Sequence, residues 1–199
     1  MTHLLITPPT AEPVTLEEVK AHLVVTTDAD DTLLLALLTA AREYVESPGL
    51  NRALLTQTWE VTLDQFPHVC QQTPHGELLL PRPPLQSVTS VKYYDGAGVQ
   101  QTLPVTDYYV DVTHEPGRIA PTVGLWWPLT LERIAAVTVR YVAGWTTVSL
   151  VPRRYKQAIL FLLAHWYENR EPLIIGSIPA RLDFTLESLL SADRIGIFA

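Results

Sequence analysis

Cysteine is almost absent from this chain of 199 residues, which contains Cys70 alone. A single thiol cannot form a disulfide within the chain, so we expect a protein of a reducing compartment. Long apolar runs are lacking too, because the longest, around 33–41 and 158–164, are too short to span a bilayer. The first ten residues, MTHLLITPPT, lack the basic start and the apolar stretch of a signal peptide. These absences predict a soluble cytoplasmic protein that does not insert into membranes.

Positive charge is also scarce. The chain has 14 Lys and Arg against 21 Asp and Glu, a net charge of −7. Residues 1–50 hold two basic and eight acidic side chains, so this segment carries most of the excess. A protein that binds duplex DNA needs a basic patch to neutralise phosphates. Arg153, Arg154 and Lys156 do cluster, but we interpret them as the solvated first turn of a helix. The sequence therefore shows no clear basic patch of the kind that a duplex DNA-binding protein needs.

Known catalytic motifs are missing from the sequence. The sequence contains no Gly-x-Ser-x-Gly elbow, no phosphate-binding loop, no dinucleotide fingerprint and no His-Glu-x-x-His pair. His68, Cys70 and His75 lie close together, but a structural zinc site wants four ligands and these spacings match no common finger. We interpret them as part of a polar loop. The sequence thus predicts a protein that is not an enzyme and that holds no cofactor and no metal.

One alternative function uses residues from the middle of the chain. Asp107, Asp111 and Glu115 could pair as the acid and base of a glycosidase. Trp126 and Trp127 could form a sugar platform. Carboxylates that alternate along a strand are usually its solvated face. Tryptophans at strand ends usually cover a core or contribute to a protein interface. A carbohydrate-binding or hydrolytic protein is therefore the second hypothesis.

The residues that are present predict a folded chain with helices at both ends. Hydrophobic residues make up 47% and charged residues 18%, a balance typical of globular proteins. Thr15 and Glu18 form a capping box, which predicts that a helix begins there. A second helix, capped by Asp28 or Asp30, is expected to run to about Glu46 and to end before a Pro-Gly pair. We assign residues 1–50 to the N-terminal part of a helical bundle.

After these helices the hydrophobic period changes from helical to alternating. The segment TWEVTLDQF places Trp59, Val61 and Leu63 on one side of a strand and polar residues on the other. Further strands flank Asp95 to Gly98, whose glycines suit a hairpin turn. We expect residues 51–151 to form an inserted antiparallel β domain.

A third helix is expected at 152–171, followed by an apolar tail at 172–199. The second and third helices are apolar on both sides, whereas an ordinary surface helix is apolar along one stripe. Large exposed apolar patches mark interaction sites. The excess of apolar surface on these two helices therefore predicts contacts with other copies of the chain or with a dedicated partner.

A series of segments, in order, resembles a known family. These are VTLEEVKAHL, DDTLLLALLTAAREYVE, QTWEVTLDQFP, LPRPPLQSVTSVKYYD, PGRIAP, VRYVAGW and KQAILFLLAHWYENRE. Together they cover about residues 13–171 and resemble the head–tail connector (adaptor) proteins of tailed bacteriophages and gene transfer agents. The tail matches more loosely, through LESLLSADRI.

The resemblance implies an α+β fold, in which helices from both chain ends form a bundle and an antiparallel β unit is inserted between them. It also implies a homo-oligomeric ring, a dodecamer, between the portal protein and a stopper or tail protein. Such proteins lie at the head–tail junction of the virion, are assembled in the cytoplasm of the bacterial host and are not enzymes. DNA would pass through the lumen of the ring without sequence-specific binding.

The resemblance also suggests roles for three sets of residues. Residues on the second faces of the helices would form the seam between subunits: Leu33, Leu35, Ala36, Ala40, Leu160, Phe161, Ala164 and Tyr167. Acidic residues would face the channel and weakly repel DNA: Asp28, Asp30, Asp31, Glu43 and Glu46. The apolar tail would contact the portal: Leu173, Ile174, Ile175, Leu189, Leu190, Ile195, Ile197 and Phe198.

Overall fold

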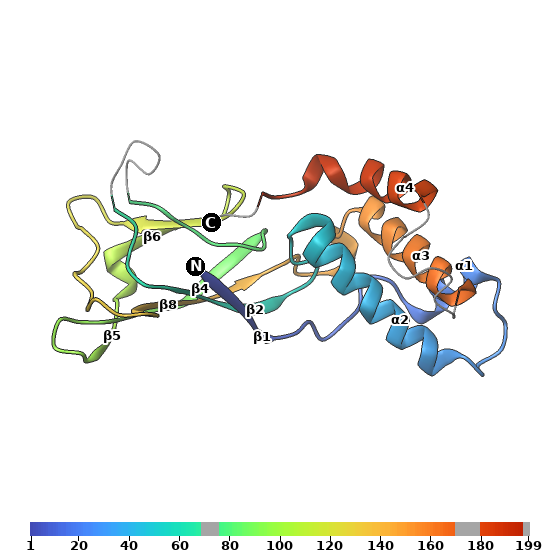
Figure 1. Cartoon of the computed structure of the whole chain (residues 1–199), viewed down its shortest axis with the longest axis horizontal. Coiled ribbons are helices and arrows are strands. Elements are labelled where there is room, and N and C mark those ends of the chain that lie inside the picture. The colour runs from blue at the N-terminus through green and yellow to red at the C-terminus, as the bar shows by residue number, and fades with distance from the viewer. Residues whose placement is uncertain (69–75, 170–179, 197–199) are drawn as a thin grey trace. The chain divides into compact units, whose positions relative to one another are not determined.

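The computed structural model describes residues 1–68, 76–169 and 180–196 (Figure 1). The chain divides into two compact units. The β unit contains Met1–Pro9 and Thr56–Gly144, and the helical unit contains Thr10–Leu55 and Trp145–Gly196. Helices and antiparallel sheets are both present, so the predicted α+β class is confirmed. Within the described residues, no helix combines the length and apolar character needed to cross a membrane.

The larger sheet of the β unit is five-stranded and antiparallel. Alternation of side chains explains its inner face, where Val61 lies opposite Val139 and both are fully buried. The Tyr141 hydroxyl, buried on the same face, donates to the carbonyl of Pro81 at 2.9 Å. In spatial order the strands are β1 (Thr2–Thr7), β2 (Gln57–Leu63), β8 (Val137–Ala143), β4 (Leu85–Tyr94) and β5 (Gln100–Thr102).

A second, three-stranded sheet completes the β unit. Its order is β3 (Leu78–Leu79), β7 (Arg118–Pro121) and β6 (Tyr108–Asp111). Gly117, just before β7, approaches Leu85 so closely that an added Cβ would lie 2.4 Å from the Leu85 Cβ. Glycine is therefore required where the chain entering this sheet meets β4 of the larger sheet.

The helical unit is built from both ends of the chain. The Thr15 capping box is confirmed, because the Thr15 hydroxyl accepts the Glu18 N–H at 3.1 Å and the Glu18 carboxylate accepts the Thr15 N–H at 2.8 Å. The helices are α1 (Leu16–Leu23), α2 (Asp31–Tyr44), α3 (Arg153–Glu168) and α4 (Ala180–Leu190), and a π-helical segment, η1 (Val45–Leu50), extends α2.

One continuous core holds these helices together. Three residues of α2 are fully buried on one stripe of the helix: Leu34, Leu38 and Ala41. They belong to the same cluster as four buried residues of α3: Tyr155, Ile159, Leu162 and Leu163. α4 adds Leu186 and Leu190 to this core, so part of the predicted tail belongs to the packed interior.

The predicted boundaries between the units differ from the structure. Residues 1–9 belong to the β unit rather than to the helical part, because β1 pairs with β2. The second α-helix ends at Tyr44, before Pro48–Gly49 as predicted, and the π-helical segment η1 carries the chain on to Leu50. The helical unit also includes residues 51–55 and 145–151, which were assigned to the β domain. These differences come from long-range pairing and packing, which local periodicity does not report.

A buried ion-pair network ties the segment before α1 to α2. The Arg42 side chain, 5% exposed, contacts Glu46 at 2.6 Å and Glu12 at 2.9 Å. Glu46 also accepts the backbone N–H of Leu54 at 2.8 Å, and Thr39 donates to Glu12 at 3.0 Å. Glu46 was predicted to face a channel, and that prediction is wrong because its carboxylate lies inside the unit.

We expect Arg42→Ala to lower the free energy of unfolding by about 3–5 kcal/mol, because it leaves the Glu46 carboxylate buried without its cation. Glu43→Ala is the matched control, since the Glu43 side chain is 67% exposed and its contact with Arg42 is 3.6 Å. Exposed pairs contribute at most about 1 kcal/mol. Chemical unfolding followed by circular dichroism measures the free energy of unfolding of both variants. Equal losses of this free energy in the two variants would contradict the assigned role of Arg42.

Candidate interaction surfaces

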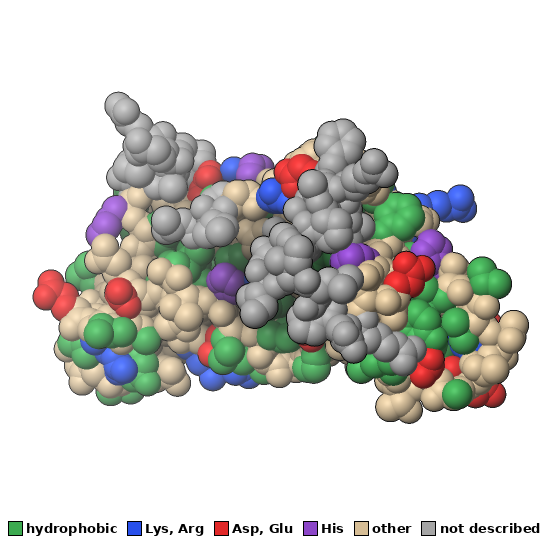
Figure 2. Space-filling model, turned by 45° about the vertical axis from the view of Figure 1, so that its right-hand side comes forward, with side chains coloured by type: hydrophobic (Ala, Val, Ile, Leu, Met, Phe, Trp, Pro, Cys, Tyr) green, Lys and Arg blue, Asp and Glu red, His purple; other side chains and the backbone are tan. Residues whose placement is uncertain are grey.

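The predicted seam residues lie in two kinds of environment on the helical unit. Three residues of α2 are exposed: Leu35, Ala36 and Ala40. The other five are half-buried: Leu33, Leu160, Phe161, Ala164 and Tyr167. Of these five, Leu160 and Tyr167 pack against the core of their own unit, so α3 has less uncovered apolar surface than its sequence suggested. On the face shown in Figure 2, hydrophobic side chains lie beside acidic ones.

The predicted channel-facing carboxylates are mostly engaged within the helical unit. Lys20 bridges Asp28 at 2.5 Å and Asp31 at 2.8 Å. The hydrogen bond from Lys20 lowers the pKa of Asp28, and the same contact raises the pKa of Lys20. Asp30 accepts the Tyr167 hydroxyl at 2.6 Å, which joins the start of α2 to α3. Glu43 and Asp28 are the most exposed of the set, with side chains 67% and 88% exposed.

The structure describes only some of the residues that were predicted to contact the portal. Leu190 is 1% exposed in the helical core, so the prediction that it contacts the portal is wrong. Leu189 is half-buried and packs against the same core. The backbone N–H of Ile195 donates to the Leu50 carbonyl at 2.9 Å. The remaining members lie outside the described residues: Leu173, Ile174, Ile175, Ile197 and Phe198.

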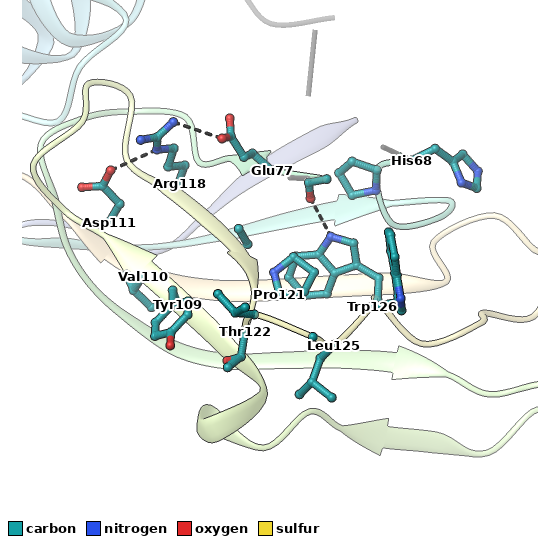
Figure 3. A pocket seen from close by; sticks show the side chains of 16 residues that line it. His68, Glu77, Tyr109, Val110, Asp111, Arg118, Pro121, Thr122, Leu125 and Trp126 are labelled. Atoms are coloured by element: carbon teal, nitrogen blue, oxygen red, sulfur yellow. Dashed lines mark hydrogen bonds and ion pairs between the residues drawn. The ribbon is translucent and has the colours of Figure 1, made fainter. Parts of the chain in front are cut away.

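The β unit contains a pocket of about 830 Å³ beside β6 and β7 (Figure 3). Its lining is mainly apolar and includes Tyr109, Pro121 and Leu125 together with the adjacent Trp126 and Trp127. Trp127 stacks on Phe66 with ring centroids 4.6 Å apart, and its indole N–H donates to the Gly76 carbonyl at 2.6 Å. Trp127 therefore covers a core residue, as strand-end tryptophans commonly do, whereas Trp126 is 78% exposed.

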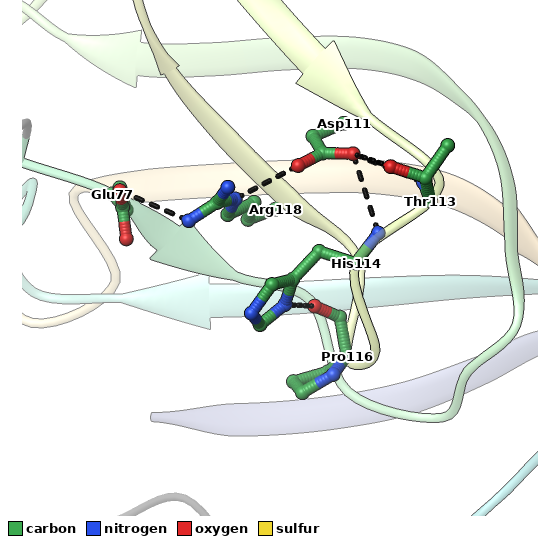
Figure 4. Close-up of polar contacts among 6 residues, drawn as sticks. All are labelled: Glu77, Asp111, Thr113, His114, Pro116 and Arg118. Carbon is green, nitrogen blue, oxygen red and sulfur yellow. Dashed lines mark hydrogen bonds and ion pairs between the residues drawn. The ribbon is translucent and has the colours of Figure 1, made fainter.

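A polar network forms one end of this pocket (Figures 3 and 4). Arg118 lies between Asp111 at 3.0 Å and Glu77 at 3.2 Å. Asp111 also accepts hydrogen bonds from the hydroxyl and N–H of Thr113 and from the N–H of His114. The Thr113 hydroxyl and then the Arg118 guanidinium hold the pKa of Asp111 well below its usual range.

This geometry does not assemble the acid–base pair suggested by the sequence. Asp111, Trp126 and Trp127 all line the pocket, but Asp107 does not. Instead, Asp107 accepts the Thr106 hydroxyl at 2.9 Å. A general acid at neutral pH needs a raised carboxyl pKa, and that of Asp111 is lowered. The structure therefore does not bring the predicted acid and base together in this pocket.

The predicted polar loop at 68–75 is only partly described. His68 lines the pocket, while Cys70 and His75 lie outside the described residues. Elsewhere, the described ranges contain no group of three His, Cys, Asp or Glu residues placed to hold a metal ion.

One family model matches the first half of the chain in part. Residues 13–91 match the family model of the phage gp6-like head-tail connector protein. The resemblance to head–tail connector proteins is confirmed. No curated protein matches the chain.

Three solved structures share the fold along the whole chain, and each alignment covers 100% of this chain and 98% of the other. The neck of an empty gene transfer agent (GTA) particle, computed with C6 symmetry, is 23% identical with a TM-score of 0.78. A chain in the virion of a native GTA particle is 22% identical with a TM-score of 0.74. A chain in the neck of a native GTA particle, computed with C12 symmetry, is 22% identical with a TM-score of 0.73.

Two exposed apolar regions of the β unit were missed by sequence reasoning. One is the segment between β7 and β8, where Val123, Leu129 and Ile134 are each at least 84% exposed. The other is β1, whose residues are all exposed. The only signal for the first was the apolar content of TVGLWWPLT between two strands, which also fits a core segment.

The Asp111 network predicts a pH-dependent stability. We expect Asp111→Asn to lower the melting temperature at pH 7, because the amide cannot replace a carboxylate beside Arg118. An unfolded aspartate has a pKa of about 3.9, so the contribution of Asp111 is complete above about pH 4 and is lost as the pH falls through its lowered folded-state pKa. The difference between variant and wild type should therefore shrink between pH 4 and pH 2 in thermal unfolding. Glu132→Gln, at an exposed site, is the control, and a pH-independent difference for Asp111→Asn would refute the assignment.

Proposed function

We propose that this protein is a non-enzymatic structural connector, whose copies form a ring, a dodecamer, at the head–tail junction of a phage or gene transfer agent. The observation that carries this proposal is the match of residues 13–91 to the connector family, together with a fold shared with neck proteins along the whole chain. The C6 and C12 symmetries of those neck structures support a ring of identical copies. The ring would join the portal to a stopper or tail protein and would be assembled in the host cytoplasm.

We assign the seam of the ring to the exposed stripe of α2. Leu35, Ala36 and Ala40 carry apolar surface that no described part of the helical unit covers. A cyclic ring needs a head-to-tail contact between two different surfaces. The half-buried side of α3, with Phe161 and Ala164, is the proposed second surface. A standard specific interface buries about 800 Å² per partner, and apolar contact of this kind supplies the driving force for association.

We assign a mildly acidic lumen to the ring. Asp28 and Glu43 are the exposed carboxylates of the predicted set, while Lys20 offsets one of the two charges of Asp28 and Asp31. A lumen that attracted phosphates would hold DNA back, whereas weak repulsion lets the duplex pass. The apolar segments of the tail, 173–175 and 197–198, remain the proposed contact with the portal.

We expect Leu35→Glu to weaken ring formation, because it places a charge in the proposed apolar seam. Leu150→Glu is the matched control, since Leu150 is 56% exposed against 47% for Leu35 and lies in the same unit. Light scattering of the purified protein, alone and mixed with the portal protein of the same particle, gives the assembled mass. If the protein stays monomeric at high concentration and does not bind the portal protein, the connector proposal is overturned. Equal assembly of the two variants would overturn the seam.

A carbohydrate-binding protein remains the second candidate, and one observation favours it: Asp111, Trp126 and Trp127 line the same pocket. An exposed indole such as that of Trp126 offers an apolar face to a sugar ring. On this hypothesis Trp126→Ala should abolish binding of a glycan found in a broad screen. A screen in which the wild-type protein binds no glycan would leave the second candidate without support.

A further inference from the structure

Strand β1 contains three consecutive apolar residues that its own unit covers only in part. It lies at one edge of the five-stranded sheet, where it pairs with β2 alone (Figure 1). All six of its residues are exposed, and Leu4, Leu5 and Ile6 are exposed to 61%, 37% and 38%. Within the described residues, each of these three consecutive apolar side chains therefore keeps more than a third of its surface exposed.

The two faces of β1 have different neighbours. Leu4 lies opposite Glu60, on the polar face where Glu60 pairs with Arg140. Leu5 lies opposite Trp59, which belongs to the other face. A helix or a sheet packed on one face would cover only one of these two leucines. A strand added alongside the free edge would reach both, because successive side chains of a strand alternate between the faces.

β1 also has few of the features by which edge strands avoid pairing. Such strands are commonly short, charged, interrupted by proline or distorted by bulges. β1 has six residues, no Lys, Arg, Asp, Glu or Pro, and a single register shift at Ile6. The His3 side chain contacts residues of its own unit. Its ring centroid lies 5.9 Å from that of Trp59, and its Nε2 lies 3.4 Å from a guanidinium nitrogen of Arg82.

The opposite edge of the same sheet is built differently. β5 has only three residues, Gln100, Gln101 and Thr102, all of them polar. Gln101 donates to the Asp95 carboxylate at 2.8 Å, which fixes a charge beside the strand. One edge of the sheet is therefore short and polar, and the other is long and apolar. This asymmetry points to a partner strand at β1.

We propose that β1 adds as a strand to the sheet of a neighbouring copy of this chain, an inference that rests on the proposed ring. Identical copies around a closed ring of more than two subunits meet through two different surfaces. β1 therefore pairs with another strand edge of the neighbour and not with the neighbour's β1, which would give a two-fold dimer. The contact joins the β units through main-chain hydrogen bonds, in addition to the proposed helical seam.

Leu4→Lys tests this contact, because a lysine on an edge strand opposes strand addition. Val105→Lys is the matched control, since Val105 is 72% exposed in the short helix η2 (Val105–Asp107), outside both sheets of the same unit. Leu4→Lys should raise the protein concentration needed for ring assembly by about tenfold or more, the effect of losing part of a specific contact. Val105→Lys should leave it unchanged, and circular dichroism should show that both variants are folded.

Amide hydrogen exchange of residues 2–7, before and after assembly of the wild-type protein with the portal, provides the second readout. Strand addition predicts that these amides become protected in the ring, which covering of side chains alone would not produce. Rings that form equally well with Leu4→Lys and leave β1 unprotected would overturn the inference while the connector proposal stands. Protection only in two-fold dimers, or only after a different neck protein is added, would also overturn it. If the wild-type protein forms no ring and does not bind the portal, the connector proposal itself fails.

Discussion

The burial of α2 against α3 is the contact on which the rest of the structure depends. Leu34 and Leu38 on one helix share a core with Ile159 and Leu162 on the other, although more than a hundred residues separate them in the sequence. The chain leaves the helical unit after Leu55 and returns at Trp145, and these two residues form a β-bridge. Residues 56–144 of the β unit are therefore inserted between two helices that pack against each other. A change that separated α2 from α3 would disrupt the helical core.

Hydrogen bonds and ion pairs add to this apolar core, and they pair the charged groups that are buried beside it. Arg42 takes part in a buried network with Glu12 and Glu46, and Asp30 receives the Tyr167 hydroxyl. These contacts explain why an acidic N-terminal segment folds without strong repulsion, since buried charges need partners. The same contacts reduce the number of carboxylates that are available to the proposed DNA channel. The proposed surfaces for assembly are the exposed apolar positions of α2 and β1.

Local patterns were sufficient for the elements whose partners lie nearby in the sequence. The Thr15 capping box, the buried stripes of α2 and α3 and the hairpin at Asp95 all follow from spacings of a few residues. The candidate surfaces were harder to predict. Apolar composition indicated that α3 had two uncovered faces, yet Leu160 and Tyr167 pack against their own unit. Periodicity reports which side of a helix is apolar, but it does not report what packs there.

By itself, the sequence determined the α+β class, the helical faces directed to the core and the resemblance to connector proteins, because each rests on local spacing or on an ordered set of segments. Only the tertiary structure decided that residues 2–7 join the β unit, that Leu190 is interior, that Glu46 is buried with Arg42, and that Asp107 and Asp111 do not share a site. The physical reason is the same in each case. Burial and strand pairing depend on residues distant in the chain, and the free energy of bringing them together is not contained in any local pattern.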